Sequence, residues 1–216
     1  MASKIKSIVA REVYSMRGHP GIETVVRTED GALGRAQVTA GLSVGKHEVK
    51  FVYDGGDRYA GRGVLKAVEN VNKVIAPALK GMDVTKQREI DETMIRLDGT
   101  PDKSRLGGNA IASVSAAVLK AAAKSLGLPL YKYIGGVNAC ILPVPGVGAL
   151  AGSIRYGGGE RAGGKPSYEF VCYGFKSFSE AVHAGWMVKR EFKNILLKKY
   201  QIEGYGYLIV PLGKVK

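Results

Sequence analysis

The stretch IETVVRTEDGALGRAQVT, residues 22–39, holds two runs of strand-forming residues on either side of an Asp30-Gly31 pair. Aspartate followed by glycine is typical of a tight hairpin turn, because glycine adopts positive φ angles without steric cost. A third run, IKSIVAREVY at residues 5–14, comes earlier and roughly alternates between apolar and polar residues. Together the runs predict a short antiparallel meander of three strands.

Beyond residue 63 the apolar residues recur at helical spacing. Those from Val64 to Ile75 predict a helix that lasts until Pro77. A second helix is predicted to end at residue 98, and a third covers residues 109–127, with enough alanine for a close backbone approach. Strands followed by helices indicate an α+β domain, which we place at residues 1–137.

Residues 138–216 show a different pattern. ILPVP at 141–145 and YEFVCY at 168–173 are each predicted to form a strand, and the glycine-rich stretch between them is expected to lack backbone pairing. Ser177 and Glu180 have capping-box spacing, which predicts the start of a helix. This helix is expected to direct five residues inward: Phe178, Val182, Gly185, Phe192 and Ile195.

The composition is that of a globular chain with a surplus of basic residues. Apolar residues make up 45% of the 216 positions, and 32 Lys and Arg against 19 Asp and Glu give a formal net charge of +13. This charge favours anionic partners but says nothing about the fold. Cys140 and Cys172 are too few for a disulfide framework. Because no run has signal-peptide or membrane-spanning character, we expect a cytoplasmic protein without a membrane segment.

Several longer motifs resemble enolase, the phosphopyruvate hydratase family. They follow one another between residues 4 and 145: AREVY, GLSVG, RYAGRGVLKAVENVNKVIAPAL, LDGTPDKSRLGGNAIASVSAAVLKAAA, GLPLYKYIGGVN and LPVP. Their order and context are more specific than a single glycine pattern. The resemblance implies an enolase N-terminal lid domain at residues 1–137 and the truncated start of a (β/α)8 barrel at residues 138–216. The implied activity converts 2-phosphoglycerate to phosphoenolpyruvate in glycolysis, with Mg²⁺ as the cofactor.

The loop GLSVG, residues 41–45, matches a mobile lid in enolases. The resemblance implies that Gly41 and Gly45 give this lid its hinge freedom. It also implies that Ser43 helps to bind the second Mg²⁺ once substrate is in place. A serine hydroxyl and a backbone carbonyl are hard oxygen ligands of the kind that Mg²⁺ prefers. The alternative is that residues 41–45 are a plain connection between two ordered segments.

Most catalytic groups of the family have no counterpart in this sequence. Asp102 is the last aspartate, and residues 138–216 contain only five acids, all glutamates. Among them, Glu169 matches a family glutamate that assists the acid step. The resemblance implies that the metal-binding acids, the base lysine and the phosphate-binding arginine lie in later barrel strands. Because a closed barrel needs about 200 residues, we expect an incomplete barrel and no activity from this chain alone.

Three functions from different classes follow from these observations. The first is part of an enolase, completed by self-association or by a second chain such as a full-length enolase. The second is a non-catalytic enolase paralogue that acts as a protein-interaction subunit; the family's dimerisation implies Arg11 and Glu23 as contacts. The third is a polyanion or nucleic-acid binder. The basic residues of this sequence are spread along the chain, which is typical of a solvated surface. A specific nucleic-acid site is therefore not expected.

Overall fold

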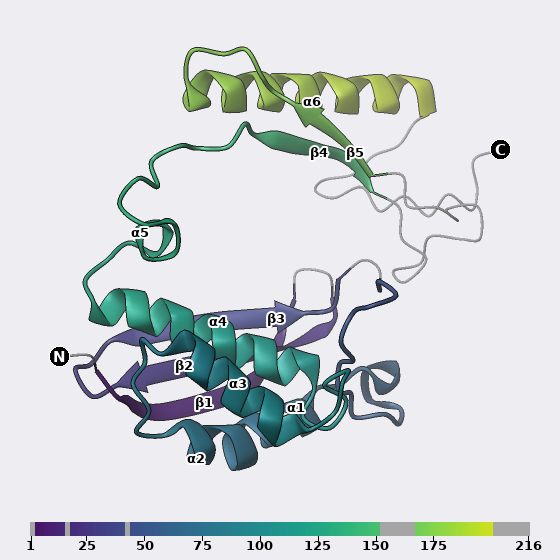
Figure 1. Cartoon of the computed structure of the whole chain (residues 1–216). Helices are drawn as coiled ribbons and strands as arrows, with labels where there is room; N and C mark the ends of the chain where they lie inside the picture. The colour runs from purple at the N-terminus through teal and green to yellow at the C-terminus, as the bar shows by residue number, and fades with distance from the viewer. Residues whose placement is uncertain (1–2, 16–17, 42–43, 152–166, 201–216) are drawn as a thin grey trace. The chain divides into compact units, whose positions relative to one another are not determined.

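The computed structural model describes residues 3–15, 18–41, 44–151 and 167–200. The chain divides into two compact units, Met1–Ala139 and Cys140–Lys216, so the division falls two residues after the boundary predicted at 137. Within the described ranges, each unit has a β-sheet of its own, with three strands in the first unit and two in the second. The first unit is an α+β domain (Figure 1).

The sheet of the first unit is the meander that the sequence predicts. Its strands are β1 (Ile5–Tyr14), β2 (Pro20–Thr28) and β3 (Leu33–Thr39), paired antiparallel in the order β1-β2-β3. The turn between β2 and β3 contains Gly31 at φ +85°, a conformation that glycine adopts without the strain of a Cβ. This prediction is therefore confirmed, including the role of the Asp30-Gly31 pair.

The first helical stretch crosses β1 and changes its winding on the way. It consists of α1 (Leu65–Asn70), the π-helical turn η2 (Val71–Ile75) and α2 (Ala76–Leu79). The prediction that this helix stops at Pro77 is wrong, because α2 continues to Leu79. The π turn explains this: Ala76 N–H donates to Val71 O, five residues back, immediately before the residue that has no N–H.

Three further α-helices follow in the first unit. They are α3 (Gln87–Asp98), α4 (Gly108–Ser125) and the short α5 (Leu130–Gly135), and a 3-10 turn, η1 (Arg58–Gly61), precedes α1. Gly99 ends α3 in the left-handed conformation at φ +70°, as its place after Asp98 indicates. The helix predicted at residues 109–127 is confirmed as α4, and its ends differ by at most two residues from the prediction. Helix α5 was not predicted.

The core lies between one face of the sheet and α4, which packs across β2 and β3 (Figure 1). Ile22, Val26, Val114 and Val118 are fully buried there. The expected close approach of the alanine-rich helix is confirmed: a Cβ added at Gly34 in β3 would collide with the backbone of α4. The helices therefore cover a single face of the sheet and leave its other face uncovered within this unit.

The second unit is a β-hairpin with one long helix. Its elements are β4 (Gly146–Ala151), β5 (Ser167–Val171) and α6 (Phe178–Tyr200), and the two strands pair antiparallel. The strand predicted at 141–145 is wrong, because Pro143 and Pro145 lack the N–H groups that a ladder needs and pairing begins at Gly146. The glycine-rich stretch was expected to be unpaired, yet its first six residues form β4.

Helix α6 begins at the predicted cap but turns a different face to the hairpin. Glu180 N–H donates to Ser177 Oγ at 3.2 Å, and Lys176 N–H donates to the Glu180 carboxylate at 3.2 Å. The small residues Ala181 and Gly185 are buried, and Gly185 lies directly against Val147 and Cys172.

This close approach fixes the rotation of α6. Phe192, which is partly buried, meets the Phe170 ring edge-on with centroids 5.7 Å apart. Phe178, Val182 and Ile195, which were expected to point inward, are instead 43%, 41% and 51% exposed. The expectation failed for these three because the smallest side chains, rather than the largest, set the contact with the hairpin.

Candidate functional site

Residues 40–48 connect β3 to the segment that approaches α4. Gly41 and Gly45 lie within the described residues, whereas Ser43 lies outside them. On the far side of the loop, Gly45 N–H donates to the Glu48 carboxylate at 2.9 Å and Glu48 N–H donates to Gly45 O at 3.2 Å. The end of the loop is therefore a turn closed by its own glutamate.

The segment after this turn, residues 49–54, is neither helix nor strand but is bound to the start of α4. Lys50 N–H donates to Asp102 O at 2.8 Å, and Gly108 N–H donates to Lys50 O at 2.7 Å. Lys50 Nζ also pairs with Asp102 at 2.9 Å, and this hydrogen bond raises the pKa of Lys50. We call residues 49–54 the exit arm.

A loop with several positive φ angles, residues 55–61, links the exit arm to α1. Tyr59 and Ala60 have φ +52° and +51°, although neither is glycine. The first amides of α1 are capped by carboxylates of this region: Leu65 and Lys66 N–H donate to Asp54, and Val64 N–H donates to Glu12. The first amides of α1, which have no partner within the helix, are therefore satisfied by protein carboxylates.

Glu12 and Arg58 hold the positive-φ loop against the sheet. Arg58 donates to both oxygens of the Glu12 carboxylate, and this hydrogen bonding, against burial, holds the pKa of Glu12 below its ordinary value. The Arg58 guanidinium also lies over the Tyr59 ring, 4.5 Å from its centroid. The strained backbone at Tyr59 is thereby held by an ion pair and a ring contact.

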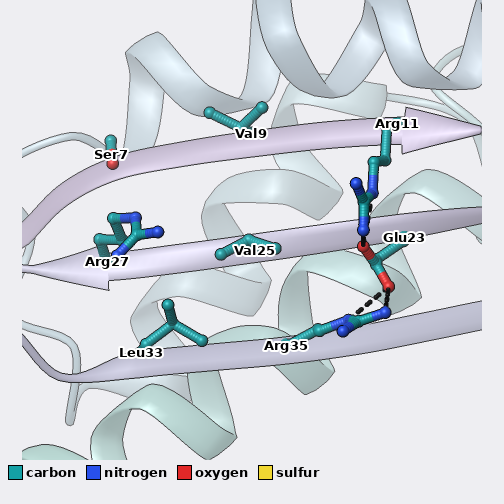
Figure 2. A pocket seen from close by; sticks show the side chains of 8 residues that line it. All are labelled: Ser7, Val9, Arg11, Glu23, Val25, Arg27, Leu33 and Arg35. Carbon is teal, nitrogen blue, oxygen red and sulfur yellow. Dashed lines mark hydrogen bonds and ion pairs between the residues drawn. The ribbon is translucent and has the colours of Figure 1, made fainter.

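The uncovered face of the sheet carries a charged network around Glu23 (Figure 2). Arg11 and Gln37 donate to the Glu23 carboxylate at 2.7 Å each, and Arg35 donates to it as well. The Glu23 side chain is 0% exposed, whereas those of Arg11 and Arg35 are 66% and 55% exposed. A carboxylate on a sheet surface is thus buried by its own partners.

The pKa of Glu23 reflects two opposing effects. Burial raises the pKa of this carboxyl, but the hydrogen bonds from Gln37, Arg11 and Arg35 outweigh burial and leave the pKa below its ordinary value. Glu23 is therefore a carboxylate at neutral pH. Glu23 and its arginine partners line a pocket on this face of the sheet (Figure 2). Val9 and Leu33 line the same pocket and are 59% and 40% exposed.

Glu169 stands on β5 in the second unit. Its register partner on β4 is Gly148, and its carboxylate lies 3.1 Å from where Gly146 would carry a Cβ. Along the chain after Glu169, the side chains of Phe170 and Cys172 point to the opposite face of the hairpin and contact α6. Glu169 is thus an exposed carboxylate on the hairpin face away from α6, beside two glycines without side chains.

The structure brings together only some of the residues that the sequence singles out. Arg11 and Glu23 are in direct contact, whereas the loop glycines and Glu169 belong to different units. Arg35 and Gln37 were missed as partners of Glu23. Side chains alternate between the two faces of β3, so residues 35 and 37 lie on the same face. With Gln37 opposite Glu23, this alternation would have placed both residues on the face of Glu23.

The described residues bear on the predictions of a metal cofactor and of a chain without a membrane segment. No group of three or more His, Cys, Asp or Glu side chains is gathered there as a metal ion would require. In the same ranges, none of the helices combines the length and apolar character needed to cross a bilayer.

The fold and the site define a class: an α+β domain whose helices cover one face of a three-stranded meander and whose other face carries a buried carboxylate network. Residues 5–134 match the family described as "Enolase, N-terminal domain". The chain therefore belongs to the enolase family.

Archaeal relatives agree with this assignment. The chain is 48% identical to the enolase of Methanopyrus kandleri over 200 residues, which is 91% of this chain and 45% of the relative. It is 49% identical to the enolase of Pyrococcus furiosus over 213 residues, 97% of this chain and 47% of the relative. The chain thus spans slightly less than half the length of these enolases.

Proposed function

We propose that this chain supplies one part of an enolase-type active site, which dehydrates 2-phosphoglycerate to phosphoenolpyruvate once another chain completes the site. The observation that supports this most is the extent of the similarity, which runs through the loop at 41–45 and continues over 97% of the chain. In this proposal, the second unit is the start of an enolase-type barrel, and its hairpin and helix are the first elements.

Two residues are assigned roles by this proposal. Ser43 would contribute a hydroxyl to a Mg²⁺ ion, a ligand type that suits this cation. Glu169 would assist the acid step, since its carboxylate is exposed and lies beside Gly146 and Gly148, which have no side chains to cover it. The chemistry that Mg²⁺ supplies when bound is neutralisation of the substrate carboxylate.

The acids of the sequence explain why we expect the isolated chain to be inactive. Removing a proton next to a carboxylate builds up negative charge that must be stabilised, and enzymes of this type use metal ions and a tuned base for that purpose. The sequence contains no aspartate after Asp102. A complementing chain would have to provide the missing acids and the base.

The test is reconstitution with a polypeptide covering the second half of Pyrococcus furiosus enolase. Phosphoenolpyruvate formation is measured with Mg²⁺ for this chain alone, for the half-enolase alone and for the mixture. We expect turnover only in the mixture. Glu169→Gln should lower it by about 100-fold or more, the usual range for an acid–base group. Glu191→Gln, at an exposed glutamate on α6, serves as the control.

Two outcomes would contradict this function in different ways. Turnover by the isolated chain would overturn the need for a second chain. A mixture that forms a stable complex but yields no product would overturn the catalytic role itself and favour the interaction subunit described next.

The uncovered sheet face favours a second candidate, a protein-interaction subunit. The pocket on this face is lined by three arginines, Arg11, Arg27 and Arg35, and by one acid, Glu23, and the apolar Val9 and Leu33 line it as well. An apolar patch rimmed by excess positive charge suits an acidic protein surface, such as that of a second enolase chain. Val9→Asp with Leu33→Asp should abolish such a complex in sedimentation experiments, whereas Ser43→Ala should leave it intact. Unchanged association of the double variant would overturn the assignment of this face.

A further inference from the structure

The exit arm, residues 49–54, is bonded along its length as if it were a strand, although it pairs with no strand. Lys50 is bonded to Asp102 and Gly108 through its N–H and its carbonyl, and Asp54 N–H donates to Gly63 O at 2.8 Å. Between them, Val52 is bonded by a side chain: its N–H donates to Asn109 Oδ1 at 3.1 Å and its carbonyl accepts from Asn109 Nδ2 at 3.1 Å. One amide side chain thus replaces a whole strand partner.

The packing around Asn109 leaves the exit arm little freedom. Asn109 is 1% exposed, at the second position of α4. Before it, a Cβ at Gly107 would come within 3.0 Å of Val52, and a Cβ at Gly108 would collide with Val49. The exit arm therefore lies directly on the backbone that opens α4, and Asn109 is the only side chain in the described ranges that bonds to both backbone groups of Val52.

We propose that Asn109 is a positioning residue, which fixes the exit arm to α4 and thereby fixes the end of the loop at residues 40–48. The functional consequence rests on the proposed function: a loop anchored at one end presents its ligand-binding residues in a defined place, so less of the binding free energy is spent on ordering it.

The chain contains a geometrically matched control for this residue. Asn72, in the π turn, accepts from Ala10 N–H at 2.8 Å and donates to Ala10 O at 3.0 Å. The two asparagines make the same pair of bonds, but Asn72 bonds to β1 rather than to the exit arm and is exposed rather than buried. Asn72→Ala therefore removes equivalent bonds without touching the loop.

The experiment is amide hydrogen exchange on the isolated full chain, which does not depend on catalysis. Asn109→Ala should accelerate exchange at Lys50 and Val52 by about tenfold or more, since each lost hydrogen bond lowers the free energy of local opening. Asn72→Ala should accelerate exchange at Ala10 and leave the exit arm unchanged. Equal acceleration throughout the first unit, or none in the exit arm, would overturn the proposal.

Two additions make the result decisive. Asn109→Asp, which keeps an oxygen for the Val52 N–H but loses the donor to the Val52 carbonyl, should also accelerate exchange in the exit arm and gives the answer if Asn109→Ala does not fold. In the reconstituted mixture, Asn109→Ala should raise KM for 2-phosphoglycerate about tenfold with a smaller change in kcat, whereas Asn72→Ala should not. An unchanged KM would overturn the functional consequence. If no variant or parent mixture turns over, the proposed function fails while the exchange result still decides the role of Asn109.

Discussion

At the scale of single residues, Glu23 is the group whose surroundings matter most. It is buried on a face that is otherwise open, and it has three side-chain partners. Glu23→Gln keeps the shape but removes the charge, so we expect the free energy of unfolding to fall by about 1–3 kcal/mol. Urea denaturation measures this change. Glu92→Gln, at an exposed glutamate paired with Arg88, should change stability by less than about 1 kcal/mol.

The same residue predicts how stability depends on pH. The pKa of Glu23 is lower in the folded chain than its ordinary value, and so is that of Asp98, where hydrogen bonds from Leu106 and Thr100 outweigh burial. Depressed carboxyl pKa values stabilise the fold above the unfolded-state pKa, and this contribution is lost as pH falls through the folded-state value. Unfolding free energy should therefore decrease on acidification below about pH 4. A smaller decrease in Glu23→Gln checks the assignment, and an identical pH profile would contradict it.

The sequence led to Arg11 and Glu23 through the family resemblance, but not to the network that they form. A single sequence does not determine register, and a shift of one residue in β3 would move Arg35 and Gln37 to the helix-covered face. The two hydrogen bonds between the Asn109 side chain and the Val52 backbone were missed for a similar reason. These residues are 57 positions apart in sequence, and no local pattern connects them.

At the scale of elements, local periodicity was sufficient to predict strands and helices that bury one continuous apolar face. It failed where small residues or prolines determine the packing or the end of an element. The meander and α4 were predicted because their apolar faces are continuous. The end of the first helix was misplaced because a π turn directly before Pro77 lets the helix continue past the residue that has no N–H. The inward face of α6 was misjudged because Gly185, which has no side chain, makes the closest contact with the hairpin.

That contact gives a prediction for the second unit. A Cβ at Gly185 would lie 2.5 Å from Val147 and 2.9 Å from Cys172 Sγ, so Gly185→Val should separate α6 from the hairpin. Cys172 is buried in the parent chain, whereas Cys140 is exposed. We expect a thiol reagent to label Cys140 quickly in both proteins and Cys172 quickly only in the variant. Equal protection of Cys172 in both would show that the contact is not needed to hold α6.

At the scale of the whole molecule, the chain consists of two units joined by a segment without helix or strand. Residues 136–145 form this segment, and Ile141 within it is 90% exposed. Proteases cut exposed backbone that is not part of a ladder or helix. We therefore expect limited proteolysis to release a stable fragment ending near residue 139, detected by mass spectrometry. First cuts within α4 would contradict the division into two units.

The order in which the meander and its covering helix occur along the chain has a consequence for biosynthesis. The three strands are neighbours in sequence, but α4, which buries Ile22 and Val26, ends 86 residues after β3. At translation speeds of about 5–20 residues per second, the ribosome completes α4 on the order of ten seconds after β3. During this interval a nascent sheet exposes its apolar face. Chaperone binding to nascent chains should therefore be strongest between the emergence of β3 and that of α4, and should fall once α4 has left the exit tunnel.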